Sequence, residues 1–274
     1  MLAAPLTMYV FYCIRDPLLY KKIYANIAAM LLVLMYHQIL NPEKPDTSIA
    51  FKEHLCYLKD NYPIILPGDN LIKNTLNICL TFDDAYFDFY YYVFPLLQQL
   101  KIPAILSIPT QFIQETTTIT SKERLAIHYP AGLAQSKQKK TPLCTWKELK
   151  EMVDSSFVQA ASHSHNHVNL TNPDININEE LQKSKFMLEQ TLQTKINTFV
   201  YPFGKNSLHT NKLAMQHYKY VMKIGSALNM DWHARDGLIY RINADSLWQK
   251  NKYITSGWVK KAQLKYWFNY IRKK

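Results

Sequence analysis

The sequence is poor in cysteine and glycine, and each shortage excludes a class of protein. Only four cysteines occur among 274 residues, widely scattered and without a CxxC pair. This spacing excludes a zinc knuckle and a dense disulfide framework, and it favours a reducing compartment. With six glycines, 13 prolines and no low-complexity tract or repeat period, the chain is neither a repeat array nor a disordered protein.

The N-terminal region lacks an apolar run long enough to cross a bilayer. Lys21 and Lys22 precede an uncharged run of about 14 residues, and a membrane helix needs roughly 20. The outline resembles a signal peptide or a short anchor, but the run continues directly to His37. We therefore expect residues 1–30 to form a helical extension or a membrane-proximal segment, followed by a buried parallel strand.

The hydrophobic content and the net charge of the chain indicate a single α/β domain with a basic surface. Hydrophobic residues make up 48% of the chain, which is enough for one large core. The net charge of +11 suits anionic partners such as nucleic acid, phospholipid head groups or phosphate-bearing glycans. Residues 258–274 mix Lys and Arg with Trp, Tyr and Phe. This segment predicts either a membrane-surface helix or an amphipathic helix docked on the core with a solvated basic face.

Short apolar runs alternate with helical patterns, which is typical of a parallel α/β sheet or barrel. The runs that predict strands are 31–36, 77–82, 104–108, 157–161, 198–201 and 221–224. The segments that predict helices are 49–61, 87–100, 146–154, 178–192 and 210–217. Residues 114–142 predict an inserted loop that either covers a cleft or has no functional role.

Polar clusters follow four of the predicted strands. His37 follows the first, Asp83 and Asp84 the second, His163 and His167 the fourth, and residues 201–204 the fifth. Loops that leave the carboxyl edge of parallel strands converge, so we expect these residues to lie together.

Two adjacent carboxylates, Asp83 and Asp84, end the second apolar run. Like charges this close repel unless a cation lies beside them or one of them is protonated. A divalent metal resolves the repulsion, because one Asp can bind it while the other remains a free base. The alternative is that an Asp only caps the helix that follows.

The segment His163 to His167 contains three histidines. Residues four apart lie on the same face of a helical turn, so His163 and His167 can bind one ion while His165 points elsewhere. Two imidazoles and one carboxylate leave positions for water and substrate, as in catalytic metal sites. Zn²⁺ is the leading ion, and Co²⁺, Ni²⁺ and Fe²⁺ suit the same ligands.

These segments resemble a known family. TFDDA at 81–85 and HSHNH at 163–167 are similar to the first two motifs of the polysaccharide deacetylases, the NodB-homology group or carbohydrate esterase family four. The nearest type acts on poly-N-acetylglucosamine and lipopolysaccharide sugars. The resemblance covers about 32–242, with LMYHQI at 34–39, FKEHLCYLKDNY at 51–62, IPAILSI at 102–108, TWKEL at 145–149, YPFG at 201–204 and YRI at 240–242.

The resemblance implies a distorted (β/α) barrel of seven or eight strands in one domain, which we place at 31–257. It also implies that Asp83 is the catalytic base and that Asp84, His163 and His167 bind the metal. The metal polarises the acetyl carbonyl and acidifies its water, and Asp83 takes the proton. The oxyanion would be bound by the metal and by a backbone N–H near Tyr201.

The sequence departs from the family pattern at three places. Ala85 replaces a usual glycine, which matters if the position needs a positive φ. Val200 stands where an Arg often orients the base, so Arg241 is the expected substitute. No histidine follows His233, and the late histidine that acts as general acid is therefore missing. His37 is either the substitute acid or a structural hydrogen-bond partner.

The expected function is metal-dependent N-deacetylation of an N-acetylhexosamine in a lipid-linked sugar or a polysaccharide, and the alternative is a catalytically impaired carbohydrate-binding protein. Peripheral membrane contact is expected, and nucleic-acid binding is not, because only the net charge favours it. The expected location is the cytoplasm or the cytosolic face of the inner membrane, with the periplasm as the alternative. We expect six residues to bind the substrate: Tyr201, Pro202, Phe203, Trp146, Trp232 and Arg241. For the aromatic residues among them, the alternative is that they only pack in the core.

Overall fold

Seven parallel strands form a closed barrel in the computed structural model, which describes residues 29–40, 47–126, 143–233, 237–248 and 254–271. Each strand pairs with the next, and β7 pairs with β1 to close the barrel. The strands are β1 (Ala29–Tyr36), β2 (Thr75–Phe82), β3 (Ala104–Ile108), β4 (Val158–Ser162), β5 (Thr198–Val200), β6 (Tyr220–Ile224) and β7 (Leu238–Asn243). The predicted (β/α) barrel is confirmed, and it has seven strands.

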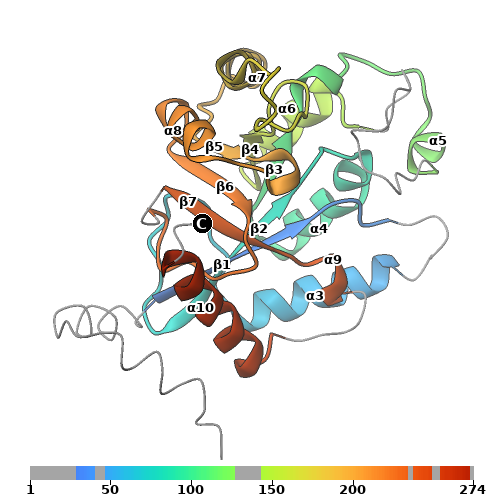
Figure 1. The fold of residues 1–274 in the computed structure, drawn as a ribbon. Coiled ribbons are helices and arrows are strands. Elements are labelled where there is room, and N and C mark those ends of the chain that lie inside the picture. Colours follow the sequence, from blue (N-terminus) through green and yellow to red (C-terminus); the bar gives the residue numbers. More distant parts are fainter. Residues whose placement is uncertain (1–28, 41–46, 127–142, 234–236, 249–253, 272–274) are drawn as a thin grey trace, which may run out of the picture.

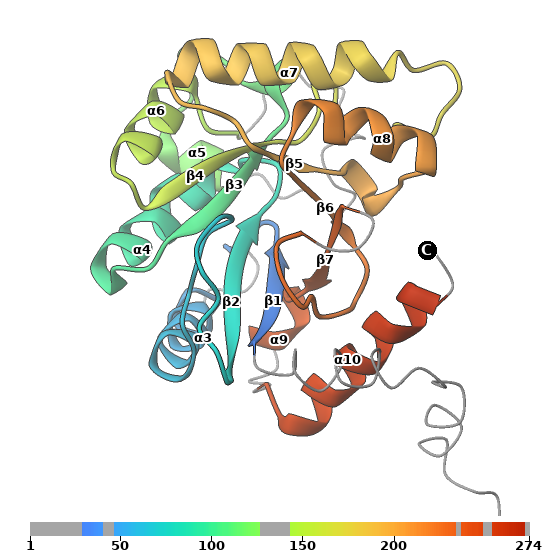
Figure 2. The ribbon, with the colours of Figure 1, turned by 90° about the vertical axis from the view of Figure 1, so that its left-hand side faces the viewer.

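Helices surround the barrel on its outer side (Figures 1 and 2). The described helical elements are α3 (Thr47–Asn61), η1 (Phe89–Val93), α4 (Phe94–Leu100), η2 (Thr110–Phe112), α5 (Ser121–Leu125), α6 (Trp146–Asp154), α7 (Ile177–Leu192), η4 (Pro202–Gly204), α8 (Leu208–His217), α9 (Asp245–Trp248) and α10 (Ser256–Ile271). Side chains define several of their starts. Thr145 and Glu148 form a capping box at α6, and Asn176 caps α7.

The two faces of each strand face different cores, because successive side chains point to opposite sides. In β1, Leu32 and Leu34 pack outward among the helices, whereas Leu31 and Val33 belong to a separate cluster inside the barrel. That inner cluster also contains side chains from the other six strands: Cys79, Ile105, Ala161, Val200, Tyr220, Met222 and Ile239. The interior is therefore apolar through most of its depth.

The inward positions become polar toward the carboxyl ends of the strands. Along β2 the alternate residues are Cys79, Thr81 and then Asp83, all buried. On β7 the inward Ile239 is followed two residues later by the fully buried Arg241. The same alternation that builds the core thus delivers charged groups to one end of the barrel.

The predicted strands and main helices agree with the structure within about two residues at most ends. The sequence did not predict β7, because Arg241 interrupts its apolar pattern. The predicted helix at 87–100 is instead a π-helical turn, η1, followed by α4. The described part of the predicted loop at 114–142 contains the short helix α5.

The terminal predictions have different outcomes. The proposed extension at 1–30 falls almost entirely outside the described residues, and the domain boundaries at 31–257 and 258–274 stay predictions. A C-terminal helix does form, as α10. Among the described helices, none combines the length and the hydrophobicity needed to cross a membrane.

Candidate active site

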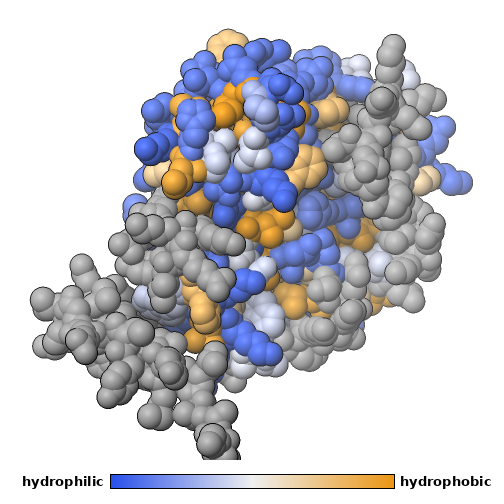
Figure 3. All heavy atoms as spheres, viewed as in Figure 1, coloured by the Kyte–Doolittle hydropathy of each residue, from blue (hydrophilic) through white to orange (hydrophobic). Residues whose placement is uncertain are grey.

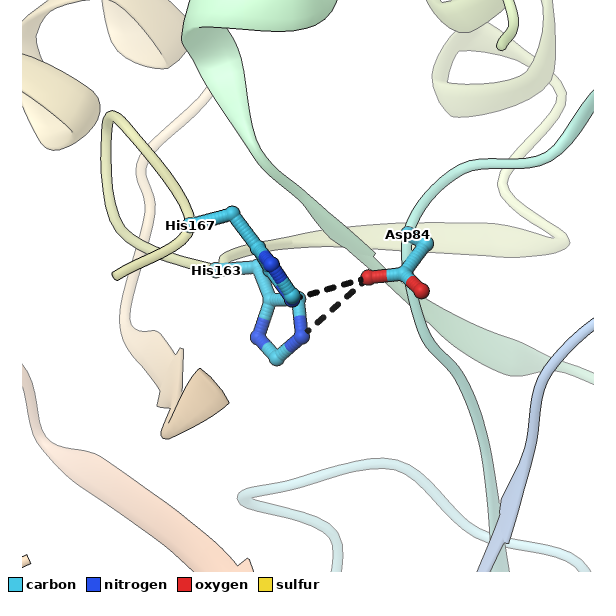
Figure 4. A group of neighbouring side chains, drawn as sticks. All are labelled: Asp84, His163 and His167. Atoms are coloured by element: carbon cyan, nitrogen blue, oxygen red, sulfur yellow. Dashed lines mark ion pairs between the residues drawn. The ribbon is translucent and has the colours of Figure 1, made fainter. Parts of the chain in front are cut away.

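Asp84, His163 and His167 converge at the carboxyl end of the barrel. Asp84 follows β2, and both histidines lie on the loop after β4. All three side chains are buried, and their ligand atoms lie within 4.8 Å of one another. Asp84 Oδ1 is 3.1 Å from His167 Nε2 and 3.5 Å from His163 Nε2, the two contacts dashed in Figure 4. The three side chains therefore form one compact group of one carboxylate and two imidazoles, although residues 163–167 are a loop with positive φ at Ser164 and His167 and not the helical turn that the spacing had suggested.

The chemistry of this group fits a divalent cation. Burial lowers the pKa of His163 to about 4, so its imidazole is neutral at physiological pH. His163 Nδ1 lies 2.8 Å from the Val200 carbonyl, which can only accept, so this nitrogen carries the proton and Nε2 has a free lone pair. Asp84 Oδ1 is buried without a hydrogen bond despite its two neighbours. A cation would satisfy this oxygen and both imidazole nitrogens.

The backbone around the ligands adopts conformations that side chains disfavour. Asp84 and Ala85 have φ values of 72° and 53°, and Ser164 and His167 have 62° and 50°. A left-handed conformation costs a non-glycine residue about 1 kcal/mol or more. Ala85 thus occupies a position that does require positive φ, and the Cys144 N–H donates to its carbonyl at 2.8 Å.

Glu180 holds the histidine loop from the neighbouring helix α7. Its Oε2 accepts the backbone N–H groups of His165 and Asn166 at 2.9 and 2.8 Å, and its Oε1 accepts the Asn166 side-chain amide at 2.6 Å. The carboxylate is buried. Glu180 was not expected from the sequence, because a glutamate at the start of a helix usually lies in solvent.

Asp83 is paired with Arg241 in the barrel interior. The guanidinium donates to both carboxylate oxygens, at 2.7 and 2.8 Å, and the Ser107 hydroxyl donates to Oδ1 at 2.6 Å. Burial alone would raise the pKa of Asp83, but the charge of Arg241, helped by His163 and His37, holds it well below its usual range. Asp83 is therefore an oriented carboxylate that is ionised at physiological pH, the state that a general base requires.

His37 and Asp245 form a second pair at the same edge. His37 Nδ1 lies 3.0 Å from Asp245 Oδ2, and the His37 backbone N–H donates to Oδ1 at 3.2 Å. Burial would lower the pKa of His37, but the hydrogen bond to Asp245 and the charges of Asp83 and Asp84 raise it to about 9. The imidazole is protonated at neutral pH, with Nε2 left for another partner. Asp245 was not foreseen from the sequence.

Comparison with known proteins identifies the family. The family model described as polysaccharide deacetylase matches residues 73–221, which is more than half of the chain. This chain belongs to the polysaccharide deacetylase family. No curated protein matches the sequence.

Solved structures show the same fold. BC0361, a polysaccharide deacetylase from Bacillus cereus, is 21% identical with a TM-score of 0.62 over 79% of this chain and 65% of its own. IcaB from Ammonifex degensii is 18% identical with a TM-score of 0.63, over 85% and 97%. The deacetylase PplD from Streptococcus pyogenes is 22% identical with a TM-score of 0.60, over 79% and 92%. The chain spans about two thirds of the Bacillus protein.

The YPFG segment at 201–204 is mostly structural in this polysaccharide deacetylase. Tyr201 is fully buried, and its hydroxyl donates to Asn211 at 3.1 Å. Its backbone N–H donates to the Met222 carbonyl at 2.9 Å, so this N–H does not serve as an oxyanion donor. Pro202 is also buried. Phe203 differs: it is 47% exposed, and its ring centroid lies 4.8 Å from that of His167.

Three further predicted substrate contacts are corrected by burial. Trp146, 5% exposed, packs in the outer core as the first residue of α6. Trp232 packs against Tyr220 at the start of β6, at the opposite end of the barrel, and donates to the Asp69 carbonyl at 2.9 Å. Arg241 is fully buried and donates to both oxygens of Asp83, which is the orienting contact expected of it from the sequence.

Proposed function

We propose that this protein is a metal-dependent N-deacetylase that hydrolyses the acetamide of an N-acetylhexosamine. One observation carries the proposal: the Asp83 carboxylate, held by two hydrogen bonds from Arg241, is adjacent in sequence to the metal ligand Asp84. A fixed base beside a divalent ion is the arrangement that activates water for attack on an amide. The retained base and the protonated His37 disfavour a protein that only binds sugars.

Asp84, His163 and His167 would hold the ion, and Zn²⁺ suits their mixed nitrogen and oxygen donors best. Co²⁺, Ni²⁺ and Fe²⁺ accept the same ligands. When bound, the ion would polarise the acetyl carbonyl and lower the pKa of water. The protein's contribution is to supply the neutral His163 imidazole, the His167 imidazole and an otherwise unsatisfied buried oxygen of Asp84.

The proton transfers belong to Asp83 and His37. Asp83 removes a proton from the water molecule while the water oxygen bonds to the carbonyl carbon of the acetyl group. His37, protonated at neutral pH, donates a proton to the nitrogen as the carbon–nitrogen bond breaks. The products are acetate and a free amino sugar. Asp245 favours the protonated form of His37 by raising its pKa, and the proton that His37 gives up is replaced from solvent after each turnover.

The carrier of the sugar is the finer part of the proposal. We favour a hexosamine on a lipid phosphate over a neutral polymer, because the net charge of +11 attracts anionic substrates. The expected location is the cytoplasm or the cytosolic face of the inner membrane, with the periplasm as the alternative.

Acetate release tests the function directly. Purified protein would be assayed on free, polymeric and polyprenyl-phosphate-linked N-acetylhexosamines, with chelator and then with added Zn²⁺. Chelator-sensitive release that Zn²⁺ restores is the expected result, with the lipid-linked sugar turned over fastest. Metal binding without acetate release from any of these substrates would contradict the proposal.

A further inference from the structure

The C-terminal helix α10 has one face against the protein and one in solvent. Ala262 and Tyr266, one turn apart, are its buried residues, and Tyr266 packs on Tyr240 of β7. The Leu228 N–H donates to the Ala262 carbonyl at 3.3 Å. These contacts fix the rotation of the helix about its axis. That rotation determines which residues of α10 point into solvent.

The solvent face of α10 carries two neighbouring apolar side chains surrounded by lysines. Leu264 and Phe268 lie one turn apart, and each is 47% exposed. Lys260, Lys261 and Lys265 are exposed on the same face, and none of them forms a salt bridge with a carboxylate in the described part of the chain. Hydrophobic and hydrophilic atoms lie side by side over this region in Figure 3, which has the view of Figure 1.

The C-terminal end of α10 lies beside the loop that follows β6, at the carboxyl end of the barrel. Near the end of α10, the Asn269 amide donates to the Gly225 carbonyl at 3.4 Å. Gly225 follows Ile224, the 37% exposed last residue of β6. A Cβ placed on Gly204 would lie only 2.8 Å from Ile224 Cβ, so the backbone beside Phe203 packs directly on Ile224. The end of α10 is thus linked through Gly225 and Ile224 to the loop that carries Phe203, whose ring lies beside His167.

We propose that the exposed face of α10 docks on the surface of an anionic phospholipid membrane. The three lysines would pair with lipid phosphates, while Leu264 and Phe268 enter the boundary between head groups and acyl chains. Two apolar side chains are far too little for a stable protein interface, which buries about 800 Å² on each partner. Nucleic acid would pair with the lysines but leaves the Leu and Phe without a partner.

Docking in this position would bring the enzyme to its substrate, and this role of the docking rests on the proposed function. The carboxyl edge of the barrel would lie near the bilayer, where a lipid-linked hexosamine presents its sugar. The membrane affinity itself does not depend on catalysis. It can therefore be measured without a sugar substrate, and the two proposals can fail separately.

Vesicle sedimentation of the full chain tests the docking. We expect the protein to sediment with phosphatidylcholine vesicles that contain phosphatidylglycerol, to bind pure phosphatidylcholine at least tenfold more weakly, and to dissociate in high salt. The triple variant Lys260→Gln, Lys261→Gln, Lys265→Gln should lose at least tenfold in affinity, since each lysine near an anionic surface contributes about fivefold. Leu264→Gln with Phe268→Gln should lose a similar amount.

Matched controls come from the opposite end of the molecule, where α6 and α7 lie in Figures 1 and 2. Lys147, Lys183 and Lys195 are exposed, and their change to Gln alters the net charge equally. Phe186, 63% exposed on α7, is the control for the apolar pair. Circular dichroism and thermal midpoints verify folding. Equal losses in the α10 and control variants, unchanged binding of the α10 variants, or equal binding to neutral vesicles would each overturn the proposal.

Discussion

The two ends of the barrel are built from the same strands but in opposite ways. At the amino end, apolar side chains such as Leu31, Ile65 and Trp232 close the interior. At the carboxyl end, the buried groups are charged or titratable, including Asp83, Asp84 and His163. At this end the half-exposed ring of Phe203 places a large apolar side chain beside His167.

Positive φ values outside glycine occur at both ends of the barrel. Asn74, Lys101, Ser156 and Gln193 adopt them before the amino ends of strands, and Asp84, Ala85, Ser164, His167, Phe203 and Ser226 adopt them in loops at the carboxyl end. At the carboxyl end, Glu180 and the Cys144 N–H hold the strained loops that carry the ligands. The contrast between the two ends therefore lies in their side chains: the amino end and the outer core supply stability, whereas the carboxyl end holds costly charged groups in place for chemistry. Four substitutions test this division.

Asp83→Asn should have the largest effect on turnover. The amide cannot accept the proton from water, so kcat should fall by about 10³-fold or more, while the three metal ligands remain. Acetate release gives kcat, and metal analysis of the purified variant gives the zinc content. Turnover within tenfold of the original protein would remove Asp83 from the role of base.

His163→Ala should abolish metal binding. Loss of one of three ligands is expected to weaken zinc affinity at least a hundredfold, as measured by competition with a chromophoric chelator. His165→Ala is the matched control, because His165 bonds to Thr110 at 2.8 Å and lies outside the group of ligands. Equal zinc loss in both variants would mean that the loop, and not the ligand, had been damaged.

Asp245→Asn should shift the pH dependence of the reaction. His37 donates only when protonated, so activity is lost as the pH rises through its pKa of about 9. Without the Asp245 charge this pKa moves toward 6.5, and the basic limb of kcat/KM should move down with it. We expect about tenfold less activity near pH 8 and little change near pH 6. A bound cation lowers the starting pKa but leaves the direction of the shift unchanged.

The same shift has a consequence for stability. Because the folded pKa of His37 is raised, its contribution to stability is complete below about pH 6.5 and is lost as the pH rises through about 9. Denaturant unfolding of Asp245→Asn across this range should show a flatter pH dependence. An unchanged basic limb together with unchanged unfolding curves would mean that Asp245 does not act on His37.

Trp232→Leu should affect only stability. The smaller side chain leaves a cavity at the amino end and removes the hydrogen bond to Asp69, at a cost of about 2 kcal/mol in the free energy of unfolding. Because Trp232 lies at the opposite end from the ligands, kcat should stay within twofold. Denaturant unfolding and acetate release measure the two quantities, and lost turnover with unchanged stability would contradict the separation of the two ends.

Apolar runs that end in polar residues predicted six of the seven strands from the sequence alone, because the period of a strand relates residues only a few positions apart. The short interval between His163 and His167 predicted that these candidate ligands lie together, which they do in a loop and not in a helical turn. The resemblance to a family added the roles of Asp83 and Asp84.

The pairing of Asp245 with His37, across 208 positions in the chain, could be seen only in the tertiary structure, because β7 closes the barrel against β1. The same closure brings Arg241 to Asp83 across 158 positions, a contact that only the family pattern had led us to expect. Closure also decided which aromatic residues are core, since it buries Tyr201 and Trp232 and leaves Phe203 exposed. The local periodicity of a strand determines whether a side chain points into or out of the barrel. The order of the strands around the barrel determines which other side chains it contacts.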